Sequence, residues 1–220
     1  MKVGTDADLL GTLGEGGQHI LDIGTGTGVL SLMYAQRYPD AQITAIEIDE
    51  NAIIDATVNF KASPMGTRIT LLHTSFQDFL KANNKGEIFD SVICNPPYFE
   101  KSTECPDNSR TRARHTSSLP FSVLTTGAYR MLRPDGVFSV CIPPEVLAQF
   151  CGECALAGFR MKAIYRIKSV PEKEAKRLVV IHKKGDVAEA IDETHCMRNA
   201  DRSRSEWYRE LMSDFLITSK

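Results

Sequence analysis

The segment most suited to chemistry is Asn95-Pro96-Pro97-Tyr98, which directly follows an apolar run at 89–94. If that run is a buried strand, the turn after it presents the Asn95 side-chain oxygen and the Pro96 carbonyl as hydrogen-bond acceptors. Proline at 96 and 97 fixes φ, so both acceptors are held in place before a ligand arrives. Tyr98 adds a face on which a planar group can stack. The pattern predicts a catalytic site that grips an amino-substituted ring or an amide and makes its nitrogen reactive.

A glycine-rich loop lies upstream, where Asp22 precedes Gly24, Gly26 and Gly28. Glycines at a strand-to-helix turn permit a tight turn and a close approach of the backbone to a ligand. A dinucleotide-binding loop of the G-x-G-x-x-G type would need glycine at position 29, where this chain has Val29. The D-x-G-x-G-x-G pattern instead resembles the first motif of S-adenosylmethionine-dependent methyltransferases. In those families the aspartate, here Asp22, orders the loop and meets the amino-acid portion of the cofactor.

The second expected strand ends in residues that fit the other half of such a cofactor. Glu47 lies 21 residues after Gly26 and can accept hydrogen bonds from both ribose hydroxyls. Asp49 is a competing candidate, because strand alternation puts it on the same side as Glu47. We expect Glu47 and its neighbour Ile48 to contact the cofactor.

Short β-rich apolar runs alternate with helical patterns along most of the chain. Strands are expected at 19–23, 42–48, 68–73, 89–94 and 136–142, and helices at 29–37, 50–62, 76–82 and 120–132. This alternation predicts an α/β fold with a mostly parallel, doubly wound, Rossmann-like sheet. We see no internal repeat or low-complexity linker, so residues 1–220 are expected to form one domain.

The pattern changes after Pro143-Pro144. Strands at 161–168 and 177–182 are expected to pair as an antiparallel hairpin that closes the far edge of the sheet. A capping box at 203–206 then indicates a last helix. Its apolar residues recur at helical spacing and predict a stripe that docks on the core, formed by Trp207, Leu211 and Phe215.

Composition limits the class of protein. The chain has 220 residues, 42% apolar and 25% charged, with a net charge of −2, which is typical of a soluble globular protein. No apolar run approaches the roughly 18 residues that span a bilayer, and the first residues do not resemble a secretion signal. We therefore expect a cytoplasmic protein. Six cysteines, with one C-x-x-C at 151–154, predict neither a disulfide scaffold nor a metal site. The oligomeric state stays open.

Two basic segments predict contact with nucleic acid. The second of them, at 155–184, has nine Lys or Arg against two acids, a local charge of +7, and includes the candidates Lys176 and Arg177. Such clustering fits a face that follows phosphates, so binding is expected to weaken steeply with added salt. The first segment follows the Asn-Pro-Pro-Tyr turn and contributes the candidates Lys101, Arg110, Arg112, Arg114 and His115.

Taken together, these motifs resemble class I methyltransferases that modify planar nitrogens with an Asn/Asp-Pro-Pro-Tyr/Phe motif. More narrowly, the chain resembles the bacterial valine-tRNA adenine-N(6)-methyltransferase family, which methylates the adenosine next to the anticodon. The resemblance covers nearly the whole chain, through LDIGTGTGVLSLM, AIEID, ICNPPYF, ARHTSSL and SEWYRELMSDFL. It implies a class I methyltransferase fold, S-adenosylmethionine as cofactor and a tRNA adenosine as substrate.

The same resemblance adds cofactor-site candidates. In that family a Lys-x-Gly-Thr-Asp segment lies beside the methionine end of the cofactor, which here implicates Lys2, Thr5 and Asp6. Relatives often hold the cofactor's adenine with an aspartate shortly after the third strand. The corresponding stretch here offers Ser75 or Asp78 instead.

Four other functions compete with this interpretation. An Asn-Pro-Pro-Tyr turn can also hold a glutamine side-chain amide, as in protein methyltransferases that modify release factors, and other RNA or DNA amines can be substrates. A cofactor-binding or RNA-binding scaffold without catalysis would not need the intact tetrapeptide. An NAD-dependent oxidoreductase is disfavoured by Val29.

Overall fold

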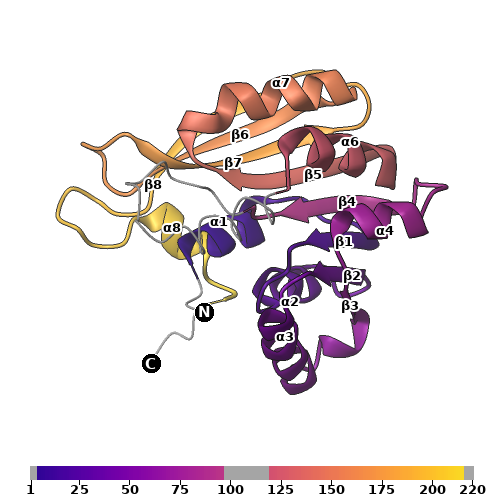
Figure 1. The fold of residues 1–220 in the computed structure, drawn as a ribbon. Helices are drawn as coiled ribbons and strands as arrows, with labels where there is room; N and C mark the ends of the chain where they lie inside the picture. The colour runs from indigo at the N-terminus through magenta and orange to yellow at the C-terminus, as the bar shows by residue number, and fades with distance from the viewer. Residues whose placement is uncertain (1–3, 97–118, 216–220) are drawn as a thin grey trace, which may run out of the picture.

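The computed structural model describes residues 4–96 and 119–215, which form an eight-stranded sheet between two layers of helices (Figure 1). The strand order is β3-β2-β1-β4-β5-β7-β6-β8. The strands are β1 (His19–Ile23), β2 (Gln42–Glu47), β3 (Ile69–His73), β4 (Phe89–Cys94), β5 (Leu132–Ile142), β6 (Arg160–Lys168), β7 (Ala175–Lys183) and β8 (Ile191–Cys196). The α-helices are α1 (Thr5–Leu13), α2 (Val29–Arg37), α3 (Glu50–Ala62), α4 (Phe76–Ala82), α6 (Phe121–Met131), α7 (Leu147–Ala157) and α8 (Glu206–Leu211).

Strand directions confirm the predicted fold class. Strands β3, β2, β1, β4 and β5 run parallel, whereas β7 lies antiparallel between β5 and β6. The sheet is therefore mostly parallel, with the expected C-terminal antiparallel hairpin formed by β6 and β7.

The far edge of the sheet differs from the prediction. The hairpin does not close that edge, because β8 pairs in parallel with β6 outside it. Residues 191–196 read IDETHC, and the first four are exposed, so no apolar run or clean alternation marks the strand. An edge strand pairs on one side only and tolerates polar side chains. Its sequence therefore need not show the apolar pattern from which strands are predicted.

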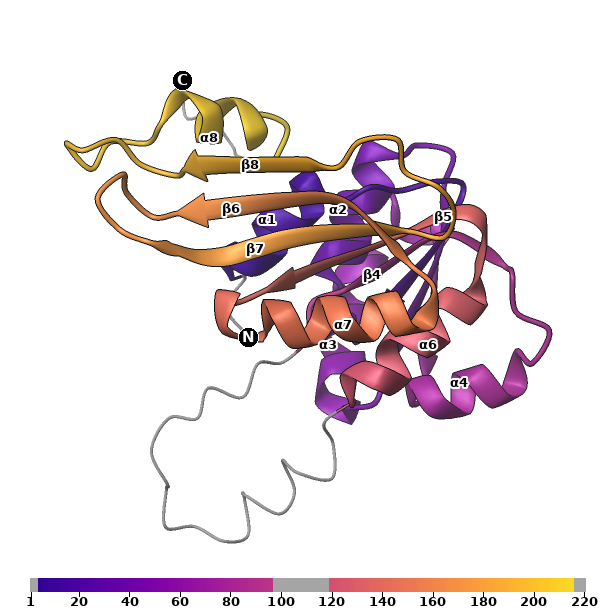
Figure 2. The ribbon, with the colours of Figure 1, turned by 90° about the horizontal axis from the view of Figure 1, so that it is seen from above.

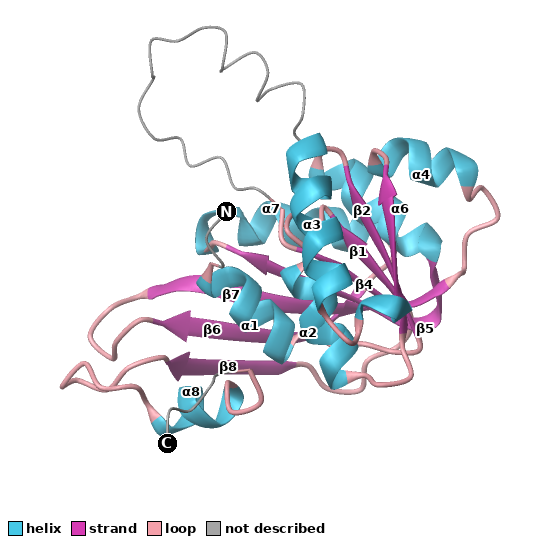
Figure 3. Cartoon of the chain, turned by 90° about the horizontal axis from the view of Figure 1, so that it is seen from below, coloured by secondary structure: helices cyan, strands magenta, loops and turns pink. Residues whose placement is uncertain are grey.

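Helices cover both faces of the sheet. Helices α4, α6 and α7 pack on one face through Phe79, Leu124 and Phe150, and Figure 2 shows these helices together. Helices α1, α2, α3 and α8 cover the other face, as Figure 3 shows from below. Because both faces are covered, the central strands are buried on both sides and appear in the sequence as continuous apolar runs such as β4.

Helix α1 is fixed against the sheet and against α2. Leu9 and Leu10 are fully buried in the cluster that also contains Tyr34 of α2. The Arg37 guanidinium donates to the carbonyls of Gly11 and Gly14, both at 2.8 Å, where the last turn of α1 leaves carbonyls without helical partners. This docking holds the first turn of α1 beside the carboxyl ends of the strands.

The last helix begins two residues later than the sequence predicts. Ser205, rather than Ser203, is its N-cap, since the Ser205 hydroxyl accepts a hydrogen bond from the Tyr208 N–H at 3.1 Å. Trp207 and Leu211 pack against the core as expected. The helix ends at Leu211, so Phe215 does not extend a helical stripe.

Replacing Leu10 by Ala should lower the free energy of unfolding by about 2–5 kcal/mol, because it leaves a cavity in a fully buried site. The matched control is Leu156→Ala on α7, where the leucine is 85% exposed and the expected change is within about 0.5 kcal/mol. Urea unfolding of both variants measures the difference. Equal effects would contradict the assigned packing of α1.

Candidate active site

The predicted site residues meet where the strand order reverses. In the order β3-β2-β1-β4-β5 the reversal falls between β1 and β4, which is where open α/β sheets bind ligands at the carboxyl ends of their strands. Ile23 and Cys94 are paired residues at the ends of these two strands. The loop that starts at Gly24 and the turn that starts at Asn95 therefore leave the sheet side by side.

The glycine loop has a backbone that only glycine adopts readily. Gly24, Gly26 and Gly28 have φ of 70°, 58° and 85°, all in the left-handed region. The Gly24 and Thr25 N–H groups donate to the Ile46 carbonyl at 2.9 and 3.0 Å, which anchors the loop on β2. A Cβ at Gly24 would meet no described atom within 4 Å, so the backbone there faces open space.

Glu47 faces this loop directly. Its Oε2 accepts from the Gly26 N–H at 2.9 Å, and its Oε1 accepts from the N–H groups of Ile48 and Asp49 at 2.7 and 2.9 Å. Three donors occupy a carboxylate that has about four acceptor positions, so Oε2 keeps one for a ligand. The competing candidate Asp49 is the N-cap of α3 and accepts from the Ala52 N–H at 2.8 Å.

Asp22, at the end of β1, holds the glycine loop through buried hydrogen bonds. Its carboxylate is fully buried, and its Oδ2 accepts hydrogen bonds from the hydroxyls of Thr25 and Ser31, both at 2.7 Å. Its Oδ1 is buried without a partner among residues 4–96 and 119–215. Burial raises the pKa of Asp22 from 3.8 to about 6; the two hydroxyls oppose this rise and the charge of Glu47 adds to it. Asp22 therefore ties the loop to the first turns of α2 at an electrostatic cost.

The Asn-Pro-Pro-Tyr turn is described only in its first half. Asn95 is partly buried and Pro96 is buried, directly after the buried end of β4. The candidates Pro97 and Tyr98 lie outside the described residues, as do Lys2, Lys101, Arg110, Arg112, Arg114 and His115.

Two residues with separately predicted roles are paired in the structure. The Arg177 Nε donates to Asp6 Oδ1, which joins β7 to the first turn of α1. Leu178, the residue after Arg177, pairs with Ile142 at the end of β5, which places the pair of Asp6 and Arg177 at the carboxyl edge of the sheet. Arg177 is partly buried, whereas the neighbouring Lys176 is exposed. Thr5, the first residue of α1, lies at the same edge.

Ser75 and Asp78 form a helix cap. Ser75 is the N-cap of α4, where its hydroxyl accepts from the Asp78 N–H at 3.0 Å and donates to Asp78 Oδ2 at 2.7 Å. Lys81 also donates to Asp78, and these hydrogen bonds hold the pKa of Asp78 below its ordinary value. The cap lies after β3, beside the end of β2.

His73 is a residue at this edge that the sequence did not reveal. It pairs in register with Glu47, and its Nε2 lies 3.0 Å from the Ile48 carbonyl oxygen. Because a carbonyl only accepts, Nε2 carries the hydrogen and donates. Only the register of β2 against β3 brings His73 to this position, and no motif in the sequence marks it.

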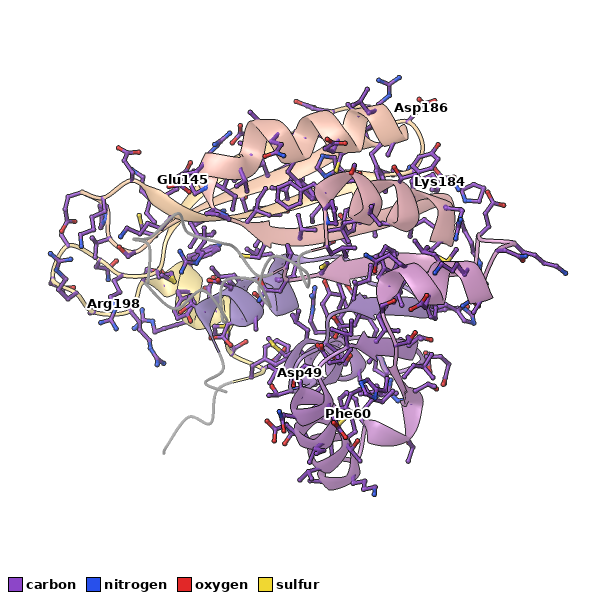
Figure 4. All side chains as sticks on the ribbon, in the orientation of Figure 1. Asp49, Phe60, Glu145, Lys184, Asp186 and Arg198 are labelled. Carbon is purple, nitrogen blue, oxygen red and sulfur yellow. The ribbon has the colours of Figure 1, made fainter. Side chains whose placement is uncertain are left out.

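The basic residues of segment 155–184 are divided between the amino ends and the carboxyl ends of the sheet's parallel strands. Figure 4 shows Lys184 at the opposite end of the molecule from Arg198. The lysines at the amino-end edge are in ion pairs: Lys162 with Glu15 at 2.5 Å, Lys183 with Asp135 at 2.8 Å and Lys184 with Glu87 at 3.1 Å. The basic residues that give the local charge of +7 therefore do not lie on one face of the molecule.

Comparison with known proteins agrees with this geometry. The family model described as the methyltransferase small domain matches residues 3–142, which include the glycine loop, Glu47 and the Asn-Pro-Pro-Tyr turn. Proteins named tRNA1(Val) (adenine(37)-N6)-methyltransferase are 35% identical to this chain in Shewanella sediminis and 37% identical in Bacteroides thetaiotaomicron. These alignments cover 99% and 100% of this chain and 93% and 92% of the two relatives. The chain belongs to this methyltransferase family.

Solved structures confirm that this methyltransferase has the class I fold. A crystal structure described as a predicted O-methyltransferase from Agrobacterium tumefaciens superposes with a TM-score of 0.73 at 20% identity, covering 98% of this chain and 99% of that one. A methyltransferase from Pyrococcus furiosus gives a TM-score of 0.54 at 21% identity, over 81% and 80% of the two chains.

S-adenosylmethionine, the cofactor predicted from the sequence, fits the described residues of the methyltransferase. The open backbone at Gly24 leaves room for a ligand, and Glu47 offers a free acceptor position next to it. Ile48 follows with 60% of its surface exposed, which gives an apolar face beside these polar groups. Apolar contact with a few placed polar groups is what a nucleoside requires.

Residues 4–96 and 119–215 contain no group of three or more His, Cys, Asp or Glu that could hold a metal ion. No helix within those ranges is long and apolar enough to cross a bilayer.

Gly28→Ala should destabilise the fold more than Gly24→Ala. Both positions have positive φ, but a Cβ at Gly28 would lie 2.4 Å from the Phe60 ring, whereas no described atom lies near one at Gly24. We expect losses of about 2–4 kcal/mol at Gly28, from strain plus overpacking, and about 1–2 kcal/mol at Gly24, from strain alone. Urea unfolding of the two variants tests the order, and the reverse order would contradict the loop geometry.

Asp22→Asn should change how stability depends on pH. The folded-state pKa of Asp22, about 6, exceeds the unfolded value of 3.8, so the native chain binds more protons between them. Wild-type stability therefore falls as pH rises through this window, and an asparagine removes the effect. The free energy of unfolding of the wild type should fall by about 1–3 kcal/mol relative to Asp22→Asn. Urea unfolding across the window measures this; parallel pH curves would contradict a buried, charged Asp22.

Proposed function

We propose that this chain transfers a methyl group from S-adenosylmethionine to the exocyclic N6 amine of an adenosine in tRNA. The relatives' names specify adenine 37 of a valine tRNA, and we propose the same nucleotide as the target of this enzyme. The observation that carries the proposal is the pairing of Ile23 with Cys94, which sets the glycine loop beside the Asn-Pro-Pro turn. Because the proposed substrate is a tRNA, we also propose that the enzyme is cytoplasmic.

When bound, S-adenosylmethionine supplies an electrophilic methyl group on a sulfonium. Gly24, Gly26 and Gly28 shape the loop that receives it, and Asp22 holds this loop through Thr25 and Ser31. Glu47 accepts from a ribose hydroxyl through the free position on Oε2 while the Gly26 N–H keeps the carboxylate oriented. Ile48 packs on the flat nucleoside.

Residues around this core complete the proposed cofactor site. We assign the adenine end of the cofactor to Ser75 or Asp78, at the start of α4, and its methionine end to Lys2, Thr5 and Asp6. Arg177, which stays a candidate RNA contact, also has a positioning role, because it holds Asp6 and thereby the first turn of α1.

Asn95 makes the target amine nucleophilic. An adenine amine is a weak nucleophile because its lone pair is delocalised into the ring. The Asn95 side-chain oxygen and the Pro96 carbonyl accept hydrogen bonds from its two hydrogens, which favours a tetrahedral nitrogen with a localised lone pair. The same oxygens stabilise the positive charge that develops on nitrogen as the N–C bond to the methyl group forms and the methyl–sulfur bond breaks, with its electron pair left on sulfur, until one proton leaves to water. From the sequence, we assign to Pro97 the role of restricting φ in this turn and to Tyr98 the role of stacking on the base.

The tRNA approaches this site with phosphates that need cationic partners. Lys176 is exposed at the carboxyl edge, where it can contact them. We assign the same role to the residues that follow the tetrapeptide: Lys101, Arg110, Arg112, Arg114 and His115. An anticodon loop suits the enzyme because an unpaired base can turn into the pocket at low cost.

Asn95→Ala tests this proposal. Loss of one preorganised acceptor should lower kcat for methylation of a valine tRNA transcript by about 100- to 1000-fold while the affinity for S-adenosylmethionine stays unchanged. The matched control is Asn84→Ala, which removes an exposed asparagine at the amino-end edge and should leave both values unchanged.

Choice of substrate separates the proposal from its rivals. A transcript with guanosine at position 37 should not be methylated, and neither should a release factor with a glutamine acceptor. Methylation of the release factor alone would identify a glutamine-amide methyltransferase. Equal loss of cofactor binding and catalysis in Asn95→Ala would contradict the role of Asn95 as a catalytic residue.

A further inference from the structure

Two segments beyond the active site lie side by side at the carboxyl edge of the sheet. They are 168–177, around the β6–β7 turn, and 197–205, between β8 and α8, and both project at one end of the molecule (Figures 1 and 2). The Met197 N–H donates to the Lys168 carbonyl at 2.9 Å, and Arg202 forms an ion pair with Glu172 at 2.9 Å. These contacts join the two segments into one surface, here named the cationic shelf.

The charge of the shelf is opposite to that of the rest of the chain. Its two segments contain seven Lys or Arg and three Asp or Glu, a net charge of +4. Because the whole chain carries −2, the remaining residues carry −6. A concentrated positive surface on an otherwise acidic protein indicates an anionic partner.

The segment 197–205 is a hydrogen-bonded hairpin with two arginines at opposite positions of its two arms. The Asn199 N–H donates to the Ser203 carbonyl at 2.9 Å and the Ser205 N–H to the Met197 carbonyl at 3.0 Å. Arg198 and Arg204 form an antiparallel bridge pair, so two like charges face each other across the hairpin. Like charges at such positions are destabilising in the absence of a counter-ion.

The arginine at the turn of the hairpin adds to this cost. Arg202 has a φ of 69°, in the left-handed region that favours glycine or asparagine. A hairpin selected for stability alone would not combine this residue with two facing arginines. An anion bound between the arginines removes the repulsion.

The charges of the shelf are largely available to a partner. Lys173, Lys176, Arg198 and Arg204 are exposed, and no ion pair joins any of them to another described residue. Of the nearby acids, Glu172 is taken by Arg202, and Asp201 accepts from the Ser203 N–H at 2.9 Å and hydroxyl at 2.5 Å. Glu174 is the remaining carboxylate of the two segments.

We propose that the cationic shelf binds phosphates of the RNA substrate and sets the distance of the target base from Asn95. This inference rests on the proposed function. Strands β6 and β8 run parallel to β4, so the shelf and the Asn95 turn lie at the same edge of one sheet. RNA that crosses the shelf therefore continues toward the catalytic turn.

Two charge-removing double variants test the shelf: Arg198→Gln/Arg204→Gln on the hairpin and Lys173→Gln/Lys176→Gln on the β6–β7 turn. The control, Lys85→Gln/Arg160→Gln, removes the same charge from exposed residues at the amino-end edge. The measurements are binding of a valine tRNA transcript over a series of salt concentrations, KM for tRNA and for S-adenosylmethionine, and Tm.

Both shelf variants should bind tRNA roughly tenfold more weakly or worse, with the salt slope reduced by about 1–2. Their KM for tRNA should rise while the KM for S-adenosylmethionine stays unchanged, and the control should match the wild type. Tm should stay unchanged in the lysine variant and should not fall in the hairpin variant, which loses the repulsion between its arginines. Wild-type tRNA affinity and salt slope in both shelf variants would overturn the proposal, and so would an equal loss in the control. A wild type that methylates no tRNA would instead contradict the proposed function.

Discussion

Parallel pairing of β1 with β4 is the constraint on which the rest of the site depends. The two strands are distant in sequence, and their pairing places Ile23 opposite Cys94. One more residue along each strand gives the cofactor loop and the Asn-Pro-Pro turn. A slip of one residue would turn each following side chain to the other face of the sheet and separate Asn95 from Gly24.

The loop that this register positions is preorganised at a cost in stability. Glu47 binds three backbone N–H groups, and Asp22 remains buried with one oxygen unpartnered among the described residues. A fold selected for stability alone would not bury that carboxylate, whose pKa rises to about 6. Such strain is expected at a site that must hold its backbone ready for a ligand.

Local chemistry was visible in the sequence, whereas partners across the sheet were not. The glycines require positive φ and β4 requires burial, so both could be predicted from residue types alone. The pair of Asp6 with Arg177 joins residues far apart in sequence, and neither residue type predicts the other. The sequence also suggested a grouping that the structure does not have, because the basic residues of 155–184 do not form one face. Alternate residues of a strand point to opposite faces and its two ends lie at opposite edges of the sheet, so Lys184 pairs with Glu87 away from the active site.

A crystal structure with S-adenosylmethionine and an adenosine-containing ligand would show whether Asn95 and the methyl group meet at the target amine. Reacting atoms should lie about 3–3.5 Å apart and the amine about 3 Å from its acceptor. The methyl carbon should therefore lie no more than about 6 Å from the Asn95 side-chain oxygen, with the adenine amine between them. A methyl carbon directed away from Asn95 and beyond that reach would contradict the proposed role of Asn95.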